Sequence, residues 1–309
     1  MLAIFVKTLP FFMLIGLGWW AARTRLFPEV ATDWLTKFVF YFALSAMLFR
    51  FAASLSPTEL FDGRFVGAYL TGSLAVYGLT FAVARLRGRP LPEMAVEAQC
   101  SVIGNTGFLG VPMLVLLLGE RAVGPILMVL SIDLIVFSSL ITLMITGARA
   151  GRLRAAVLGA LAGGLVANPM IVSMAAGLLW SALNLPIPAP AAEFLTLLGS
   201  AATPCALFAI GASLAARSAE RLSIAVWLSL AKLVLHPAAV ALSALLIFRV
   251  EPFAAAVMIA AAALPVAGNV FMLAKHYGVA AQRVSAAILI STLASIATIS
   301  PVIAWVSHL

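Results

Sequence analysis

The chain has 309 residues, of which 64% are hydrophobic and 10% are charged. A soluble protein usually carries about 25% charged residues, so this composition excludes an ordinary globular protein and indicates a lipid environment. The formal net charge of +8 comes from short basic clusters between apolar segments. Because these clusters do not form one patch, no nucleic-acid partner is expected.

Ten apolar runs are long enough to cross a hydrocarbon core about 30 Å thick. The predicted spans are residues 2–22, 34–55, 64–84, 94–118, 123–146, 155–181, 193–215, 223–247, 253–275 and 284–306. The connections between them are short, which leaves no room for a soluble domain. The sequence therefore predicts an all-α integral membrane protein that is surrounded by the lipid bilayer.

The first run, 2–22, is interpreted as a retained span rather than a signal peptide. It lacks a basic segment before its apolar core and a small-residue cleavage site after it. Instead, Trp19 and Trp20 are followed by Arg23, which is how a helix ends at a membrane interface.

The basic residues are distributed unequally between the two ends of the spans. Thirteen lie in the odd-numbered connections and five on the opposite side: Arg23, Arg25, Lys37, Arg85, Arg87, Arg89, Arg149, Arg152, Arg154, Arg217, Arg221, Lys275 and Arg283 against Lys7, Arg50, Arg64, Arg121 and Arg249. Because an excess of Lys and Arg marks the cytoplasmic face, both termini are predicted to lie outside the cytoplasm.

The two halves of the chain resemble each other. "LFRFAASL" (48–55) and "LFAIGASL" (207–214) match with an offset of 159, and the same offset pairs Pro10 with Pro169 and Gly18 with Gly177. Farther along, Gly104–Asn105 pairs with Gly268–Asn269 at an offset of 164.

This similarity predicts two repeats, residues 1–150 and 151–309, with five spans in each. Because five is an odd number, the second repeat enters the membrane from the opposite side. Inverted repeats of this kind are typical of secondary transporters.

The repeat places two interrupted spans, the fourth and the ninth, in corresponding positions. The interruptions are "GNTGFLGVP" (104–112) and "LPVAGN" (264–269), where proline removes a backbone donor and glycine tolerates irregular dihedrals. If the broken helices cross near the midplane, their N-terminal ends attract anions. The candidate substrate-binding residues are Asn105, Thr106, Gly107, Pro112, Pro265, Gly268 and Asn269. The alternative interpretation is ordinary proline kinks and glycine packing contacts.

Several motifs together resemble the auxin efflux carrier family, and the bacterial malonate-transporter-like branch in particular. They are "NTGFLGVP" (105–112), "ANP" (167–169), "ATPCALFAIGASL" (202–214), "KLVLHP" (232–237) and "LPVAGNVFMLA" (264–274), spread over nearly the whole chain. The resemblance implies ten helices in the bacterial inner membrane, with crossed helices 4 and 9. It also implies a scaffold domain, a transport domain and elevator-like movement of carboxylates.

The chain departs from the family in two places. Relatives often carry a proline in span 2 where this chain has Leu44, Ser45 and Ala46, which puts a kink there in doubt. The long cytoplasmic loop of the plant hormone carriers is missing, so auxin is not inferred as the substrate.

Three ionisable residues inside the predicted spans are functional candidates. Asp133, the one acidic residue well inside a span, could carry a coupled proton, orient a ligand or make a structural hydrogen bond. Lys232 and His236 lie four residues apart on one helical face. Lys232 could attract an anion or counter Asp133, and His236 is either a titrating coupling residue or a packing residue. Glu97 is predicted to lie at the membrane interface.

The two cysteines, Cys100 and Cys205, indicate neither a disulfide framework nor a metal site, and no cofactor is expected. The leading function is a secondary transporter of small organic anions such as malonate, and not an enzyme. An intramembrane enzyme, or a channel or sensor on a transporter fold, is the alternative. There is no G-x-x-x-x-G-K-[ST] loop for ATP. The sequence leaves open coupling to H⁺ or Na⁺ and a homodimer.

Overall fold

The computed structural model of the chain describes residues 2–55, 62–150, 155–215 and 222–309. Within these ranges all regular elements are helices, as predicted, and extended backbone pairs at one isolated bridge. Four basic residues that entered the orientation prediction lie outside the described residues: Arg152, Arg154, Arg217 and Arg221.

The first half of the chain contains α1 (Leu2–Arg23), α2 (Glu29–Phe38), η1 (Val39–Ala43), α3 (Leu44–Ala53), α5 (Gly63–Leu86), α6 (Leu91–Val102), η2 (Thr106–Gly110), α7 (Val111–Leu118), η3 (Glu120–Ala122), α8 (Val123–Ile132), η4 (Asp133–Phe137) and α9 (Ser138–Ala150). The second half contains α10 (Ala155–Val166), α11 (Pro169–Ala182), α12 (Ala189–Ser200), α13 (Ala202–Ala215), α14 (Leu222–Leu230), η5 (Ala231–Leu235), α15 (His236–Leu242), η6 (Ser243–Ile247), α16 (Pro252–Ala262), α17 (Gly268–Tyr277) and α18 (Ala281–Val306). The element η3 is a 3₁₀-helix, and the other η elements are π-helices.

Seven helical stretches among the described residues are long and apolar enough to cross a membrane. They are Phe5–Arg23, Glu29–Ala53, Gly63–Leu86, Glu120–Ala148, Ala189–Ala215, Leu222–Ile247 and Ala281–Val306. The other three predicted runs, 94–118, 155–181 and 253–275, are each divided into shorter helices.

The sequence predicts an interruption in two of these three runs, but it treats 155–181 as one span, and the structure corrects that prediction. The chain leaves the helical conformation between α10 and α11, where Asn168 accepts a hydrogen bond of 3.0 Å from the Met170 N–H. Pro169 then begins α11, a position where its missing N–H costs nothing.

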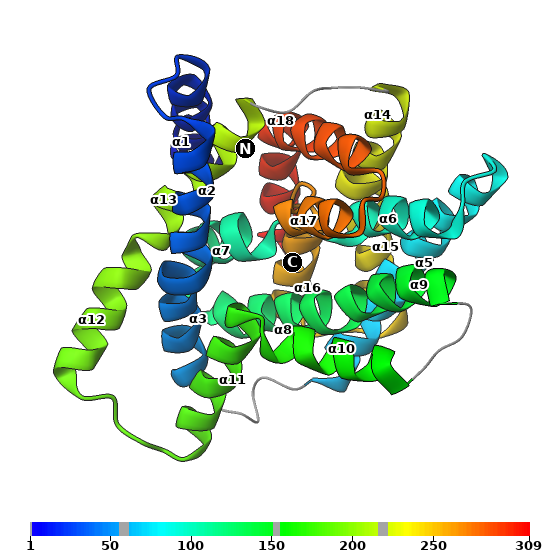
Figure 1. Ribbon diagram of the computed structural model, residues 1–309. Helices are drawn as coiled ribbons and strands as arrows, with labels where there is room; N and C mark the ends of the chain where they lie inside the picture. Colours follow the sequence, from blue (N-terminus) through cyan, green and yellow to red (C-terminus); the bar gives the residue numbers. More distant parts are fainter. Residues whose placement is uncertain (1, 56–61, 151–154, 216–221) are drawn as a thin grey trace.

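The helices form two groups (Figure 1). One group, on the left of Figure 1, consists of α1, α2, η1, α3, α11, α12 and α13, and is called the outer group here. The remaining helices form the crossing group, which contains both interrupted segments. Each group draws helices from both halves of the chain.

Close helix contacts hold the outer group together. Gly18 of α1 lies against the carbonyl of Phe208 in α13, and Gly177 of α11 lies against the carbonyl of Phe49 in α3. A Cβ atom at either glycine would overlap the facing carbonyl. The two helix pairs therefore depend on glycine for their close approach, as small residues commonly allow in membrane helices.

A cluster of charged side chains joins α5, α6 and α18 at one end of the crossing group. Glu97 is fully buried within the protein, and it accepts hydrogen bonds from Arg87 and Arg283. Arg283 also contacts Glu93 at 2.7 Å. Burial is compatible with the Glu97 charge because two guanidinium groups compensate it.

The second predicted span is irregular even though it has no proline at residues 44–46. The π-helix η1 comes directly before Leu44, and the Ser45 hydroxyl donates a hydrogen bond of 3.1 Å to the carbonyl of Phe40. A wide turn thus interrupts this span in place of a proline kink.

Candidate functional site

The fourth predicted span is broken between α6 and η2. The helix α6 ends at Val102, and Asn105 adopts φ −75° and ψ 53°. The Thr106 N–H donates a hydrogen bond of 2.7 Å to the Gly104 carbonyl, so Asn105 is the central residue of an inverse γ-turn. The interruption that the glycines and the asparagine predict is confirmed.

The ninth predicted span is broken between α16 and α17, and the two breaks contact each other. Gly104 and Val266 form an antiparallel bridge. The Asn105 N–H donates to the Pro265 carbonyl at 2.8 Å, and the Ala267 N–H donates to the Ile103 carbonyl at 3.1 Å. We call residues 103–106 and 264–269 the crossing.

Hydrogen bonding at the crossing explains how unwound backbone is tolerated inside an apolar protein. The two breaks satisfy each other's polar groups, and the Val266 N–H donates to the Ser291 hydroxyl of α18 at 3.1 Å. Backbone at membrane depth needs such partners because no lipid atom can replace them.

The two asparagines occupy different positions at the crossing. Asn105 precedes η2 and is 7% exposed. Its carbonyl accepts from the N–H groups of Leu109 and Gly110, which leaves the side-chain amide as its remaining polar group. Asn269 is the second residue of α17, and its Oδ1 is buried without a hydrogen-bond partner among the described residues.

Open space adjoins Gly268, the residue before Asn269, because a Cβ added there would meet no atom within 4 Å. A buried amide oxygen without a partner, such as the Oδ1 of Asn269, is unusual inside a protein, where most buried polar atoms are paired. The first turn of α17 is thus a place where a polar ligand could complete the hydrogen bonding.

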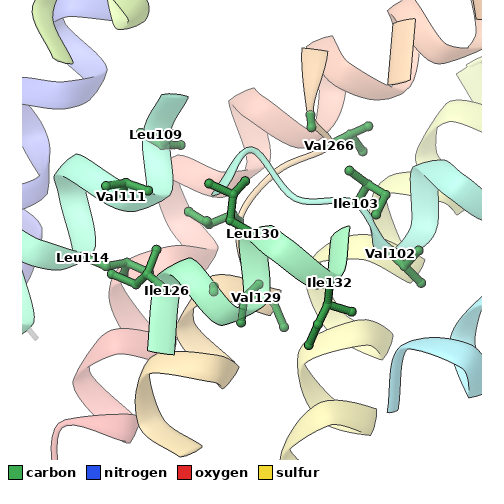
Figure 2. Close-up of a cluster of buried hydrophobic side chains, with 14 of the residues drawn as sticks. Val102, Ile103, Leu109, Val111, Leu114, Ile126, Val129, Leu130, Ile132 and Val266 are labelled. Atoms are coloured by element: carbon green, nitrogen blue, oxygen red, sulfur yellow. The ribbon is translucent and has the colours of Figure 1, made fainter. Parts of the chain in front are cut away.

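Apolar side chains form a wall on one side of the crossing (Figure 2). The wall comes from α8 and from the flanks of the breaks: Val102, Ile103, Leu109, Val111, Leu114, Ile126, Val129, Leu130, Ile132 and Val266.

The short helix η2 faces the outer group. A Cβ on Gly107 would lie 2.6 Å from the terminal methyl of Met170 in α11, and Phe108 stacks on Phe40 of η1 at 6.4 Å between ring centroids. Pro112 lies farther along, as the second residue of α7. Gly107 therefore belongs to the contact between the groups, and Pro112 belongs to the helix that follows.

Lys232 approaches the crossing from η5 and is fully buried. Its ammonium group donates to the carbonyl of Ala262, the last residue of α16, and lies 3.0 Å from Nδ1 of His236. A positive charge at a helix C-terminus is favourable because the last carbonyls carry partial negative charge.

His236 connects Lys232 to α5. Because an ammonium group only donates, Nδ1 of His236 accepts from Lys232, and Nε2 carries the proton. Nε2 then donates to the Ser73 hydroxyl at 2.9 Å. Both imidazole nitrogens are thereby satisfied inside the protein.

Asp133, the first residue of η4, is 3% exposed and accepts a hydrogen bond of 2.9 Å from the Tyr69 hydroxyl. The Tyr69 ring contacts the His236 ring at 5.9 Å between centroids. Oδ2 of Asp133 has no hydrogen-bond partner among the described residues. Asp133 and Lys232 form no direct ion pair there, but each lies within the other's electrostatic field.

The structure therefore brings the three ionisable candidates into one buried group beside the crossing. Sequence reasoning missed three residues that organise it, namely Tyr69, Ser73 and Ser291. Tyr69 and Ser73 lie four residues apart within an apolar span, and this spacing on one helical face is a signal that could have identified them.

A separate hollow of about 460 Å³ lies between α15, α16 and α18, with Leu233, Pro237 and Trp305 in its lining. Its lining is almost entirely apolar and includes neither Asn105 nor Asn269. It offers few groups that could hold a carboxylate, so the crossing is the better candidate site.

Paired interrupted helices with buried ionisable residues beside them define a multi-span membrane protein of the transporter type. The sequence matches the family described as "Membrane transport protein" over residues 3–303, and the chain belongs to this family. It is 33% identical over 295 residues to the "Putative malonate transporter" of Rhizobium meliloti (strain 1021), covering 94% of this chain and 92% of that protein. The resemblance to the auxin efflux carrier family is confirmed.

Proposed function

We propose that this membrane transport protein is a secondary transporter of small organic anions and that malonate-like dicarboxylates are its first candidate substrates. The observation that carries the proposal is the crossing, where the bridge between Gly104 and Val266 brings two broken helices together. The name of the Rhizobium meliloti relative supports malonate as the first substrate to test.

The crossing offers an anion three kinds of attraction. The first turn of α17 presents N–H groups at a positive helix end. The amides of Asn105 and Asn269 can donate hydrogen bonds to carboxylate oxygens. Lys232 adds a positive charge from behind the bridge, and its ammonium group is held by Ala262 and His236.

An elevator-type movement of the crossing group against the outer group is the proposed mechanism. Two observations support it. The helices separate into these groups, and η2 meets the outer group through Gly107 and the stacked ring of Phe108. A glycine without a side chain and a flat aromatic contact suit surfaces that slide.

Contacts within the outer group support the inverted repeat. The pair Gly18 and Phe208 becomes the pair Gly177 and Phe49 when the sequence offset of 159 is applied in each direction. Equivalent atoms make equivalent contacts, as two related five-span units would.

The charged cluster supports the proposed orientation in the inner membrane. It joins Arg87, from the third connection, to Arg283, from the ninth, and both connections are assigned to the cytoplasmic side. On the opposite side, the guanidinium of Arg121 lies over the ring of Phe253 at 5.0 Å. A phosphatase fused after Leu309 should be active, and a cytoplasmically fluorescent fusion there would contradict periplasmic termini.

Uptake into proteoliposomes tests the function. Radiolabelled malonate should accumulate with saturable kinetics, and preloaded malonate should accelerate uptake by counterflow. A carboxylate panel, including a monocarboxylate and a tricarboxylate, then defines the substrate class. Uptake that rises linearly with malonate concentration and shows no counterflow would indicate a channel and overturn the carrier proposal.

A further inference from the structure

The crossing contains two helix C-termini as well as two helix N-termini. The ends of α6 and α16 direct carbonyl oxygens toward it, and such oxygens carry partial negative charge. In carriers built from broken helices, unwound carbonyls and half-helix C-termini are the groups that hold a coupling cation. The partial negative charge of these carbonyls at the crossing therefore needs a compensating positive group.

At the end of α16 that place is filled by a side chain. The ammonium group of Lys232 donates to the carbonyl of Ala262 and lies 3.0 Å from Nδ1 of His236. On a third side it meets Gly104, where an added Cβ would lie 3.3 Å from the nitrogen. The ammonium nitrogen thus lies against both broken spans.

The surroundings of this nitrogen suit an ammonium group better than a sodium ion. Hard cations are held by several oxygen ligands. One of the two hydrogen-bond partners of the ammonium group is an imidazole nitrogen, and Ser73 holds that imidazole in the accepting orientation through Nε2 at 2.9 Å. The network is therefore arranged to accept an N–H donor.

We propose that the Lys232 ammonium occupies the position of a coupling cation at the crossing, so that malonate movement through this protein does not require Na⁺. The inference rests on the proposed transport function and specifies that Na⁺ is not its coupling ion. Lys232 is then a positioning residue. It neutralises the end of α16 and leaves Asn105 and Asn269 to contact the anion.

The first test uses the wild-type protein in proteoliposomes, with the membrane potential fixed by valinomycin and K⁺. Initial rates of malonate uptake should be equal under inward gradients of NaCl and choline chloride. A faster rate with NaCl would overturn the proposal, because a cation site would then exist in addition to Lys232.

The second test removes the tethered charge and restores it as a free molecule. Lys232→Ala should lower uptake about 10- to 150-fold, the loss expected when a buried charged group loses its hydrogen bonds. Added n-propylammonium, which matches the deleted atoms, should restore part of the rate, whereas choline should not. Lys275→Ala removes an exposed lysine at the end of α17 and should transport like the wild type.

Wild-type rates of Lys232→Ala without any added amine would contradict the proposal. If Lys232→Ala does not fold, the sodium test on the wild type still decides. If the wild type transports no carboxylate, the proposed function fails. Thermal unfolding in detergent then still shows whether a free amine binds where the Lys232 ammonium group was removed. In that case n-propylammonium should raise the melting temperature of Lys232→Ala above that in NaCl of equal ionic strength, and no difference would overturn the inference.

Discussion

The outer group and the crossing group treat the internal repeat differently. In the outer group, Gly18 and Gly177 make the same contact with the carbonyls of Phe208 and Phe49. In the crossing group, the two repeat-related asparagines differ: Asn105 precedes η2, whereas Asn269 is the second residue of α17. The buried charge of Lys232 contacts the carbonyl at the end of α16.

This difference suggests that the symmetry of the internal repeat persists where helices only pack together and is lost at the candidate binding site. Packing of two helix pairs places the same demand on each half. A single charge at one helix end needs no twin, and a second buried ammonium near the first would cost several kcal/mol more. The predictions below test this contrast from the largest expected effect to the smallest.

The largest loss of stability is expected for Glu97→Leu in the crossing group. It leaves the guanidinium groups of Arg87 and Arg283 without their shared carboxylate, and breaking a buried pair in this way costs about 3–5 kcal/mol. Thermal unfolding in detergent measures the loss. Arg89→Ala is the control, because its 3.9 Å contact with Glu93 is partly exposed and is worth about 0–1 kcal/mol. Equal losses of stability in Glu97→Leu and Arg89→Ala would show that the buried ion pairs of Glu97 do not stabilise the fold.

Equal losses are expected for Gly18→Ala and Gly177→Ala in the outer group. Each new methyl group would overlap a backbone carbonyl, and overpacking of this kind costs about 1–3 kcal/mol. Gly16→Ala, on the same helix as Gly18 but with no atom within 4 Å of the added Cβ, should be neutral. Clearly unequal losses for the two contact glycines would break the symmetry claimed for this group.

Malonate binding should weaken in both Asn105→Ala and Asn269→Ala. Loss of a hydrogen-bonding group costs about 1–3 kcal/mol, which corresponds to roughly a 5- to 150-fold rise in Kd. Asn→Asp at either site should be worse than Ala, because it places a negative charge beside an anion. Binding to purified, folded variants is the measurement. If both Ala variants bind like the wild type, the crossing is a structural joint and not the substrate site.

The smallest effect on binding is expected for Asp133→Asn, which removes the charge with little change in volume. If Asp133 carries the coupled proton, malonate should bind this variant about as tightly as the wild type, while an imposed proton gradient should no longer accelerate uptake. Tyr69→Phe removes the hydrogen bond to Asp133 and should reduce that acceleration in part. A full response of Asp133→Asn to the gradient would make Asp133 a structural residue.

The sequence predicts the interruptions well because glycine, proline and asparagine act locally. The breaks at Gly104–Asn105 and Leu264–Ala267 lie where these residues indicate. The π-helices could not be predicted in this way, since segments such as Val39–Ala43 and Ala231–Leu235 contain ordinary helix-compatible residues. A wide turn there depends on tertiary packing rather than on local propensity.

The partners of the buried charged residues also could not be predicted from the neighbouring sequence. Glu97 lies near the start of an apolar run, which suggests an interface, but its partner Arg283 is 186 residues away in the chain. Lys232 and His236 could be paired from their spacing, whereas the carbonyl that Lys232 caps lies 30 residues farther along. The repeat locates the crossing, but only the folded chain shows which side chains reach it.

The bridge at the crossing also bears on how such a protein can evolve. The two broken spans are joined by main-chain hydrogen bonds, from Asn105 to Pro265 and from Ala267 to Ile103. Every amino acid supplies a carbonyl, and every one except proline supplies an N–H, so most substitutions leave this joint intact. Selection can therefore alter the side chains around the joint, and with them the preferred substrate, without changing the fold.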